Sequence, residues 1–437
     1  MTGLGHLLAH APALRRAAGR CVAGLLLALL WGPLAWAQGS PTFALARPKA
    51  RRAVFGFDTQ RNLIIVAARL NGKGPYHFLL DTGVSISLLT NAALADSLHL
   101  ERGEEFRVVG SGGEDTPLRA YRTNEVRVEL PGVVAPRMRW LLLSEDALNL
   151  SSYAGTRIDG ILGAELFNSL VVAIWPMRGQ LICYDPGRYR APRRWTSLPL
   201  HLDQGKAYVE ATVGQQPLAA SDPAAPLPLR LVLDTGAGHA LSLETTADPR
   251  LHLPTAHLRA TLGYGLSGAV RGHLGRVATV QLGPYQLPQV LTSFPDSGQV
   301  HQRLRSQDAP RQGNLGYELL KRFNTVIDYP HQRLLLRRNA QNQLPFEHDM
   351  SGLSLVAAGP GYRYYLVTGV EAGSPAAEAG IVLNEELLAI NLLPTGVLAL
   401  SEIARLLRAR DGQRLVLVLR RPDGELHSVQ LQLRRQI

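Results

Sequence analysis

The tripeptide Asp-Thr-Gly occurs twice in the 437-residue chain, and each copy follows an apolar run typical of a β-strand. The first copy begins at Asp81 after Phe-Leu-Leu, and the second begins at Asp234 after Leu-Val-Leu. A second shared motif, a Leu-Gly pair followed by Glu-Leu, places a glycine 82 residues after each aspartate, at Gly163 and Gly316. Two units that each contribute one carboxylate predict a site where the two aspartates meet. Such a pair shares one proton, and its ionised member can act as a general base toward water.

A single Asp-Thr-Gly would be weak evidence, because a strand that runs into an Asx-turn has the same composition. Here the tripeptide is duplicated, and the second motif is duplicated with it, as Ile-Leu-Gly-Ala-Glu-Leu from Ile161 and Asn-Leu-Gly-Tyr-Glu-Leu from Asn314. The equal spacing favours one composite site over two unrelated turns.

Strand-like patterns surround each aspartate in the same order. In the first unit, residues 62–70 form a β-type run that turns at Asn71-Gly72 into the aspartate strand. In the second unit, residues 207–213 form the opening strand, and the Ala/Pro-rich residues 216–227 are expected to form a surface loop. Many short strands with frequent glycine and proline predict two β-rich lobes.

Residues 54–340 resemble the retropepsin-like aspartic proteases, with both lobes in one chain as in pepsin. The resemblance implies hydrolysis of peptide bonds by a water molecule that Asp81 and Asp234 activate, without a covalent intermediate. It also implies a supporting role for the residues that follow each aspartate, in which the threonines cross-link the two loops and the glycines permit a tight turn: Thr82, Gly83, Thr235 and Gly236.

The second copy departs from the family pattern at two positions. Asn314 replaces an apolar residue, and Gly238 stands where serine is usual and where the first copy has Ser85. We expect these departures to affect the geometry of the second half-site but not the presence of its aspartate.

Two glycine-rich segments lie at similar positions in the two units. They contain Gly110, Ser111 and Gly112 in the first unit and Gly265 in the second. These residues are candidate flaps that fold over an extended peptide, and the alternative is that they are ordinary hairpin ends.

Residues 349–437 resemble a PDZ domain. The segment 370–381, Val-Glu-Ala-Gly-Ser-Pro-Ala-Ala-Glu-Ala-Gly-Ile, is similar to the signature of bacterial protease-associated PDZ modules, although Asn384-Glu385 replaces the usual Gly-Asp. We expect a helix over 399–408 and a hairpin turn at 422–424. Gly361, Tyr362 and Arg363 are candidates for binding a peptide ligand. The resemblance implies recruitment of substrate or control of access, and a packing role alone is the alternative.

The first 37 residues have the pattern of an export signal, with a basic start, an apolar core over 21–30 and a small-x-small site that ends at Ala37. We expect cleavage after Ala37 and a periplasmic protein, or else an uncleaved anchor, in which case the protein would associate with the membrane. The predicted organisation is then a linker over 38–53, lobe 1 over 54–190, lobe 2 over 200–340 and the PDZ domain over 349–437. Only Cys183 remains after cleavage, which excludes an intramolecular disulfide.

The net charge of +11 is spread along the chain. Its densest cluster, within residues 47–52, is interpreted as a solvated linker, with an anionic membrane surface as the alternative. No interleaving of bases with aromatics suggests a nucleic-acid partner, and the thirteen histidines lack paired metal-ligand spacing, so we predict no metal and no cofactor. The predicted fold class is mainly β, with two homologous lobes and a small α+β PDZ domain, and the predicted partners are peptide or protein substrates. The rival functions are a non-catalytic peptide-binding scaffold, an adaptor in which only the PDZ domain matters, and a monomer that becomes active on dimerisation.

Overall fold

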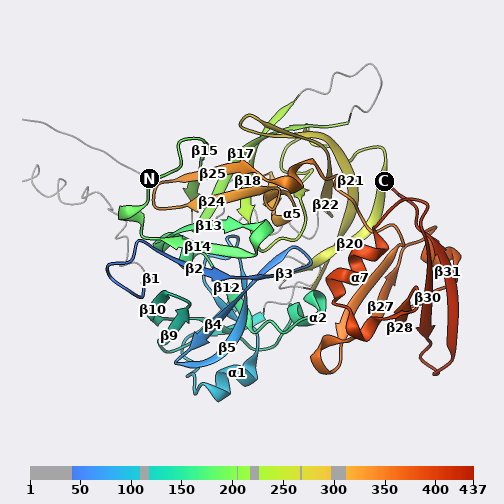
Figure 1. Cartoon of the computed structure of the whole chain (residues 1–437), viewed down its shortest axis with the longest axis horizontal. Coiled ribbons are helices and arrows are strands. Elements are labelled where there is room, and N and C mark those ends of the chain that lie inside the picture. Colours follow the sequence, from blue (N-terminus) through green and yellow to red (C-terminus); the bar gives the residue numbers. More distant parts are fainter. Residues whose placement is uncertain (1–41, 109–117, 204, 217–225, 266–267, 297–311) are drawn as a thin grey trace, which may run out of the picture. The chain divides into compact units, whose positions relative to one another are not determined.

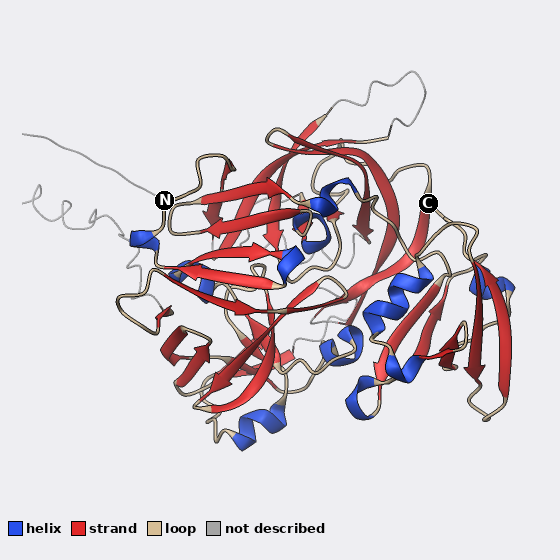
Figure 2. Ribbon diagram, in the orientation of Figure 1, coloured by secondary structure: helices blue, strands red, loops and turns tan. Residues whose placement is uncertain are grey.

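The computed structural model describes residues 42–437 apart from 109–117, 204, 217–225, 266–267 and 297–311. Most of its regular structure consists of strands (Figure 2), which confirms the prediction of a mainly β protein. Within the described part of the chain, no helix has both the length and the apolar character needed to cross a membrane. The predicted export signal lies outside the described residues.

Lobe 1 is built on an 11-stranded sheet in the order β1-β10-β9-β4-β5-β12-β6-β11-β8-β7, with β3 paired to β4. Short helices α1 (Ala92–Ser97), α2 (Leu150–Ala154) and α3 (Glu165–Ser169) connect some of its strands. The strands are β1 (Ala44–Leu45), β3 (Asp58–Gln60), β4 (Leu63–Leu70), β5 (Lys73–Leu80), β6 (Leu88–Leu89), β7 (Glu105–Val108), β8 (Leu118–Arg122), β9 (Val126–Leu130), β10 (Val133–Met138), β11 (Leu141–Leu143) and β12 (Gly160–Leu162).

Lobe 2 is built on an 8-stranded sheet in the order β16-β17-β18-β23-β19-β22-β21-β20, with a further pairing of β17 to β21. The helix α5 (Tyr317–Leu320) follows β23 directly. The strands are β16 (His201–Asp203), β17 (Lys206–Gly214), β18 (Leu227–Asp234), β19 (Leu241–Leu243), β20 (His257–Gly265), β21 (Gly268–Leu282), β22 (Tyr285–Pro295) and β23 (Gly313–Gly316).

A third, 6-stranded sheet in the order β15-β25-β24-β13-β14-β2 joins the lobes. Its central pair is β13 with β24, which run antiparallel with Val172 opposite Ile327, and Figure 1 shows this green and orange pair side by side. These two strands come from different lobes, so the lobes bond directly to one another through them. The strands are β2 (Arg52–Gly56), β13 (Val171–Trp175), β14 (Gln180–Tyr184), β15 (Thr196–Pro199), β24 (Phe323–Asp328) and β25 (Arg333–Arg338).

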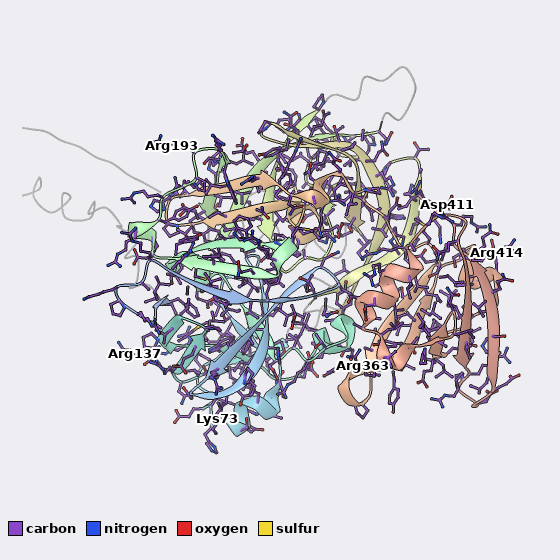
Figure 3. The ribbon with its side chains drawn as sticks, viewed as in Figure 1. Lys73, Arg137, Arg193, Arg363, Asp411 and Arg414 are labelled. Carbon is purple, nitrogen blue, oxygen red and sulfur yellow. The ribbon has the colours of Figure 1, made fainter. Side chains whose placement is uncertain are left out.

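Part of the segment 38–53, which was predicted as a linker, belongs to the sheets of the two lobes. It contains β1 and the first residues of β2, and Phe43 has only 1% of its surface exposed. Cys183 in β14 is fully buried, and burial raises the pKa of its thiol to about 12, so it acts as a small hydrophobic residue there. Charged side chains such as Lys73, Arg137 and Arg193 lie at the periphery (Figure 3).

The C-terminal domain has its own sheet and its own core. Strands β26 (Leu353–Ala358), β27 (Tyr364–Val370), β28 (Glu386–Ile390), β30 (Arg414–Arg420) and β31 (Leu426–Gln432) follow one another across the sheet, and β29 (Leu393–Pro394) pairs with β28. Helices α6 (Pro375–Glu378) and α7 (Leu400–Leu407) complete it, and α7 buries Leu400, Ile403 and Leu407. The expected helix over 399–408 and the hairpin turn between β30 and β31 are both present.

The same local topology surrounds both aspartates. In lobe 1, β5 runs parallel to β12 with Leu80 opposite Leu162, and β12 also pairs antiparallel with β6. In lobe 2, β18 runs parallel to β23 with Leu233 opposite Leu315, and β23 also pairs antiparallel with β19. Each aspartate therefore stands at the end of a central strand, beside the strand that carries the leucine of the Leu-Gly pair.

Candidate active site

The two aspartates lie at the ends of their strands and accept equivalent backbone hydrogen bonds. Asp81 follows β5, and its backbone N–H donates to the carbonyl of Leu162 at 2.9 Å. In each loop, the N–H of the glycine two residues on donates to the aspartate Oδ1: Gly83 to Asp81 at 2.7 Å and Gly236 to Asp234 at 3.1 Å. Backbone donors that bond a carboxylate favour its charged form and hold its orientation.

The carboxyl group of each aspartate lies against the glycine of the other loop. A Cβ atom built on Gly236 would lie 2.2 Å from the Asp81 carboxyl, and one built on Gly83 would lie 3.1 Å from that of Asp234. Neither glycine has a φ in the left-handed region. The Asp81 carboxyl therefore leaves no room for a side chain at Gly236, and the Asp234 carboxyl leaves little room at Gly83, whereas the expectation from sequence was a tight turn.

The two threonines join the loops through a symmetrical set of four hydrogen bonds. Thr82 N–H donates to Thr235 Oγ1 at 3.1 Å, and Thr235 N–H donates to Thr82 Oγ1 at 3.0 Å. Each hydroxyl also donates across the interface, from Thr82 to the Leu233 carbonyl at 2.6 Å and from Thr235 to the Leu80 carbonyl at 2.9 Å. Both threonines are fully buried, so these bonds hold the aspartate loops in one relative position.

Burial has the largest effect on the protonation of the aspartate pair. Burial raises the pKa of Asp81 well above its ordinary value, and the neighbouring carboxyl of Asp234, to which it is hydrogen-bonded, raises it further. The backbone N–H groups of Gly83 and Gly236 act in the opposite direction but do not outweigh these effects. The pair is therefore able to hold one proton at a pH where an exposed aspartate is ionised.

The surroundings of the two aspartates differ, in a way that the sequence motif does not reveal. The side-chain amide of Asn314 donates to Asp234 Oδ2 at 2.8 Å, so the residue that departs from the apolar pattern contacts the dyad directly. His239 replaces the exposed Ile86 of lobe 1, and burial lowers its imidazole pKa while Asp234 opposes the change. Its Nε2 is buried without a hydrogen-bond partner among the described residues.

The Glu-Leu motif supports the two aspartate loops by different contacts. In lobe 1, the Glu165 carboxylate accepts from the backbone N–H and the hydroxyl of Ser87, both at 2.8 Å, and the Ser87 hydroxyl accepts from the N–H of Gly163 at 2.9 Å. Burial raises the pKa of Glu165. In lobe 2, Ala240 occupies the position of Ser87, and Glu318 forms ion pairs with Lys321 and Arg322 instead.

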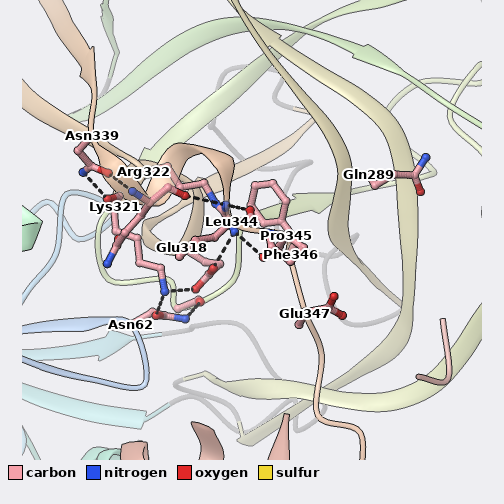
Figure 4. A network of polar contacts seen from close by, with 12 residues as sticks. Asn62, Gln289, Glu318, Lys321, Arg322, Asn339, Leu344, Pro345, Phe346 and Glu347 are labelled. Carbon is pink, nitrogen blue, oxygen red and sulfur yellow. Dashed lines mark hydrogen bonds and ion pairs between the residues drawn. The ribbon is translucent and has the colours of Figure 1, made fainter. Parts of the chain in front are cut away.

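The lobe 2 network reaches across to lobe 1 (Figure 4). Lys321 Nζ donates to Asn62 Oδ1 at 2.8 Å, and Asn62 Nδ2 donates to the carbonyl of Gly238 at 3.0 Å. A Cβ atom at Gly238 would lie 2.6 Å from the carbonyl oxygen of Arg61. The absence of serine at position 238 thus has a steric reason, because the turn between β3 and β4 occupies the space.

The remaining predicted binding residues belong to the two glycine-rich segments and to the PDZ domain. Gly110, Ser111 and Gly112 fall outside the described residues. Gly265 ends β20 opposite Gly268 of β21, at the tip of a long hairpin, and its role as a flap stays a prediction. Gly361, Tyr362 and Arg363 lie in the turn between β26 and β27, where the Arg363 guanidinium donates to the Leu398 carbonyl, and their contact with a ligand also stays a prediction. No group of three or more His, Cys, Asp or Glu that could hold a metal occurs within the described ranges.

Comparison with known proteins agrees with this geometry. Residues 66–166 and 209–319 match the aspartyl protease family, and residues 366–421 match the PDZ domain family. No curated protein matches the chain significantly.

Two solved structures show limited similarity to the chain. The photosystem II D1 C-terminal processing protease aligns at 21% identity and a TM-score of 0.18, over 19% of this chain and 22% of that one. Basic 7S globulin from soybean aligns at 8% identity and a TM-score of 0.38, over 68% of this chain and 97% of that one. Similarity at this level supports no functional argument. The family matches, with one aspartate of the dyad in each aspartyl protease region, identify two aspartyl protease regions followed by a C-terminal PDZ domain in this chain.

Proposed function

We propose that the chain is an aspartic-type endopeptidase in which Asp81 and Asp234 jointly activate a water molecule. The observation that carries this proposal is the paired arrangement of the aspartates, with each carboxyl against the glycine of the opposite loop and the threonines cross-linked beneath them. The ionised aspartate takes a proton from water as the oxygen attacks the scissile carbonyl. The protonated aspartate donates to the carbonyl oxygen, and a proton then passes to the leaving nitrogen.

The rival interpretation is a scaffold that keeps the cleft only for binding. Two carboxylates in contact, one of them only 8% exposed, are costly to bury and repel each other when both are ionised. A peptide-binding cleft needs neither carboxylate. The presence of the complete pair with its cross-links in one chain is therefore better explained by hydrolysis.

For the PDZ domain we propose a regulatory role in addition to packing. Its strand β26 lies at one edge of the sheet, and the guanidinium of Arg61 in lobe 1 donates to the carbonyl of Leu355 in this strand at 2.8 Å. Gly155, which follows α2, lies against Leu400 of α7 and Ala357 of β26, since a Cβ atom there would be 2.7 Å and 3.6 Å from their Cβ atoms. A peptide that adds to the free edge of β26 would have to displace these lobe 1 contacts.

The turn between β3 and β4, which contains Arg61 and Asn62, contacts both the PDZ domain and the second aspartate loop. Arg61 contacts β26, and its neighbour Asn62 contacts the carbonyl of Gly238, four residues after Asp234. Displacement of Arg61 by a peptide would change the support of this loop. The proposal is therefore that occupation of the PDZ edge and the geometry of the dyad influence each other.

The test is cleavage of a diverse peptide library by the purified chain without its predicted export signal, residues 38–437, from acidic to neutral pH. Asp81→Asn and Asp234→Asn should each lower kcat/KM by about 10²- to 10⁴-fold, the range for loss of a general acid or base. Asp58→Asn, an exposed aspartate of β3 in the same lobe, is the matched control and should retain activity. Cleavage that survives in both dyad variants would refute the mechanism, and no cleavage by any form would favour the scaffold. The N-terminal sequence of the protein isolated from its host tests the proposed export and cleavage after Ala37.

A further inference from the structure

The two halves of the dyad are not chemically equivalent, although their backbones are. Asn314 in β23 lies opposite Val232, and Ile161 in β12 lies opposite Leu79, so the two residues occupy the same register position in the two lobes. The lobe 2 residue has an amide, whereas the lobe 1 residue has a hydrocarbon side chain that is 5% exposed. One aspartate therefore has a polar neighbour at a position where the other lobe has an apolar one.

The amide contacts the carboxyl oxygen that the loop backbone does not hold in place. Asp234 Oδ1 accepts from the N–H of Gly236, and Oδ2 accepts from the Nδ2 of Asn314 at 2.8 Å. An amide nitrogen is only a donor, so it complements an oxygen with a free lone pair. A proton on Oδ2 would compete with the amide for the space around that oxygen. Both oxygens of Asp234 thus accept N–H donors, as an ionised carboxylate does.

The other titratable groups around Asp234 do not supply a competing charge at neutral pH. Asp81 faces it from the end of β5, and burial and Asp234 raise the pKa of Asp81. His239 faces it from its own loop, with an imidazole pKa lowered by burial, and is therefore neutral. Tyr329 lies beyond the end of β24, and burial raises the pKa of its phenol, so it is neutral as well. The amide of Asn314 distinguishes the surroundings of Asp234 from those of Asp81, and its charge does not change with pH.

We propose that Asn314 is a positioning residue that stabilises the ionised form of Asp234 and leaves the shared proton of the dyad on Asp81. This assignment rests on the proposed peptidase function for its catalytic meaning. Asp234 is then the base that takes the proton from water as the water oxygen bonds to the scissile carbon. Asp81 gives its proton to the carbonyl oxygen, so the tetrahedral species is a neutral diol and the total number of protons is unchanged.

The test replaces the amide by a hydrocarbon of similar size, in Asn314→Leu, and records kcat/KM against pH. Activity requires the singly protonated pair, so the acidic limb reports the protonation of the ionised member. Loss of a hydrogen bond to a charged group should move this limb upward by about 1 to 2 pH units. Ile161→Leu is the control at the equivalent position and should leave the limb in place, and thermal unfolding shows that both variants are folded.

A second readout does not depend on catalysis. The measurement follows the carboxyl ¹³C chemical shifts of the dyad against pH in aspartate-labelled wild-type protein and in Asn314→Leu. The variants Asp81→Asn and Asp234→Asn assign the two resonances. We expect the lower of the two apparent pKa values of the pair to rise in Asn314→Leu. An unchanged titration would overturn the role of Asn314 even if the wild type cleaves peptides. A shifted titration in a protein that cleaves nothing would support the role of Asn314 and refute the proposed function instead.

Discussion

The cross-link between the aspartate loops leads to a quantitative prediction for Thr82→Val. Valine has nearly the shape of threonine, so the change removes a hydroxyl without leaving a large cavity. The lost hydroxyl accepts from the N–H of Thr235 at 3.0 Å and donates to the carbonyl of Leu233 at 2.6 Å. Both partners would remain buried without a bond, and each such group costs about 1–3 kcal/mol. The expected loss is therefore about 2–6 kcal/mol in the free energy of unfolding.

The assay is urea unfolding of the full chain, with midpoint and slope compared between variants. Thr235→Val should lose a similar amount, because its hydroxyl makes the equivalent pair of bonds. The matched control is Thr90→Val, because Thr90 is also buried, at 2% exposure, while its Oγ1 has no hydrogen-bond partner among the described residues. We expect this control to be neutral or slightly stabilising. If Thr82→Val and Thr90→Val unfold at the same urea concentration, the threonine contacts do not contribute as the structure implies.

Three further predictions concern the dyad and the PDZ edge. The pKa of Asp81 is raised in the folded protein, so ionisation of Asp81 opposes folding at pH values above about 3.9, the pKa of an aspartate in the unfolded chain. Asp81→Asn should therefore raise Tm at pH 7, and this gain in Tm should shrink as the pH falls toward 4. An equal gain in Tm at both pH values would contradict the raised pKa. Gly236→Ala should abolish peptide cleavage, since the new Cβ would overlap the Asp81 carboxyl, and wild-type kcat/KM in this variant would show that the loops do not approach so closely. Arg61→Ala removes one hydrogen bond to β26, of about 0.5–1.5 kcal/mol, which a peptide binding at this edge would otherwise have to displace. The variant should therefore lower the Kd of a peptide selected on the full chain by about 2- to 13-fold. An unchanged Kd in calorimetry would show that the peptide binds elsewhere.

Much of the fold was predictable because its signals are local. The strand predicted over 62–70 appears as β4 from Leu63 to Leu70, and the Asn-Gly turn and the aspartate strand β5 follow it as predicted. Helix α7 and the β30–β31 hairpin also appear as expected. Burial alternation, turn residues and helical periodicity are all encoded within a few neighbouring residues, so they can be recognised without coordinates.

Other features could not be predicted, because they depend on contacts between distant residues. The segment before Val54 was interpreted as a solvated linker from its charge, yet Phe43 and the strands β1 and β2 are part of the sheets. The loss of serine at Gly238 seemed to weaken the second half-site, whereas the turn at Arg61 occupies the space where a side chain would lie. His239 had no signal in sequence, because only the folded loop brings it close to Asp234.

The two carboxylates could be identified without coordinates, because a duplicated motif at equal spacing is a property of the chain alone. The reasons for the residues around them are found in contacts between the folded lobes. Gly236 is required by the Asp81 carboxyl from the other lobe, and Asn314 contacts the carboxyl of Asp234, 80 residues away in the chain. Hydrogen bonds and steric exclusion act over a few ångströms in space, so they become visible only when folding brings the lobes together.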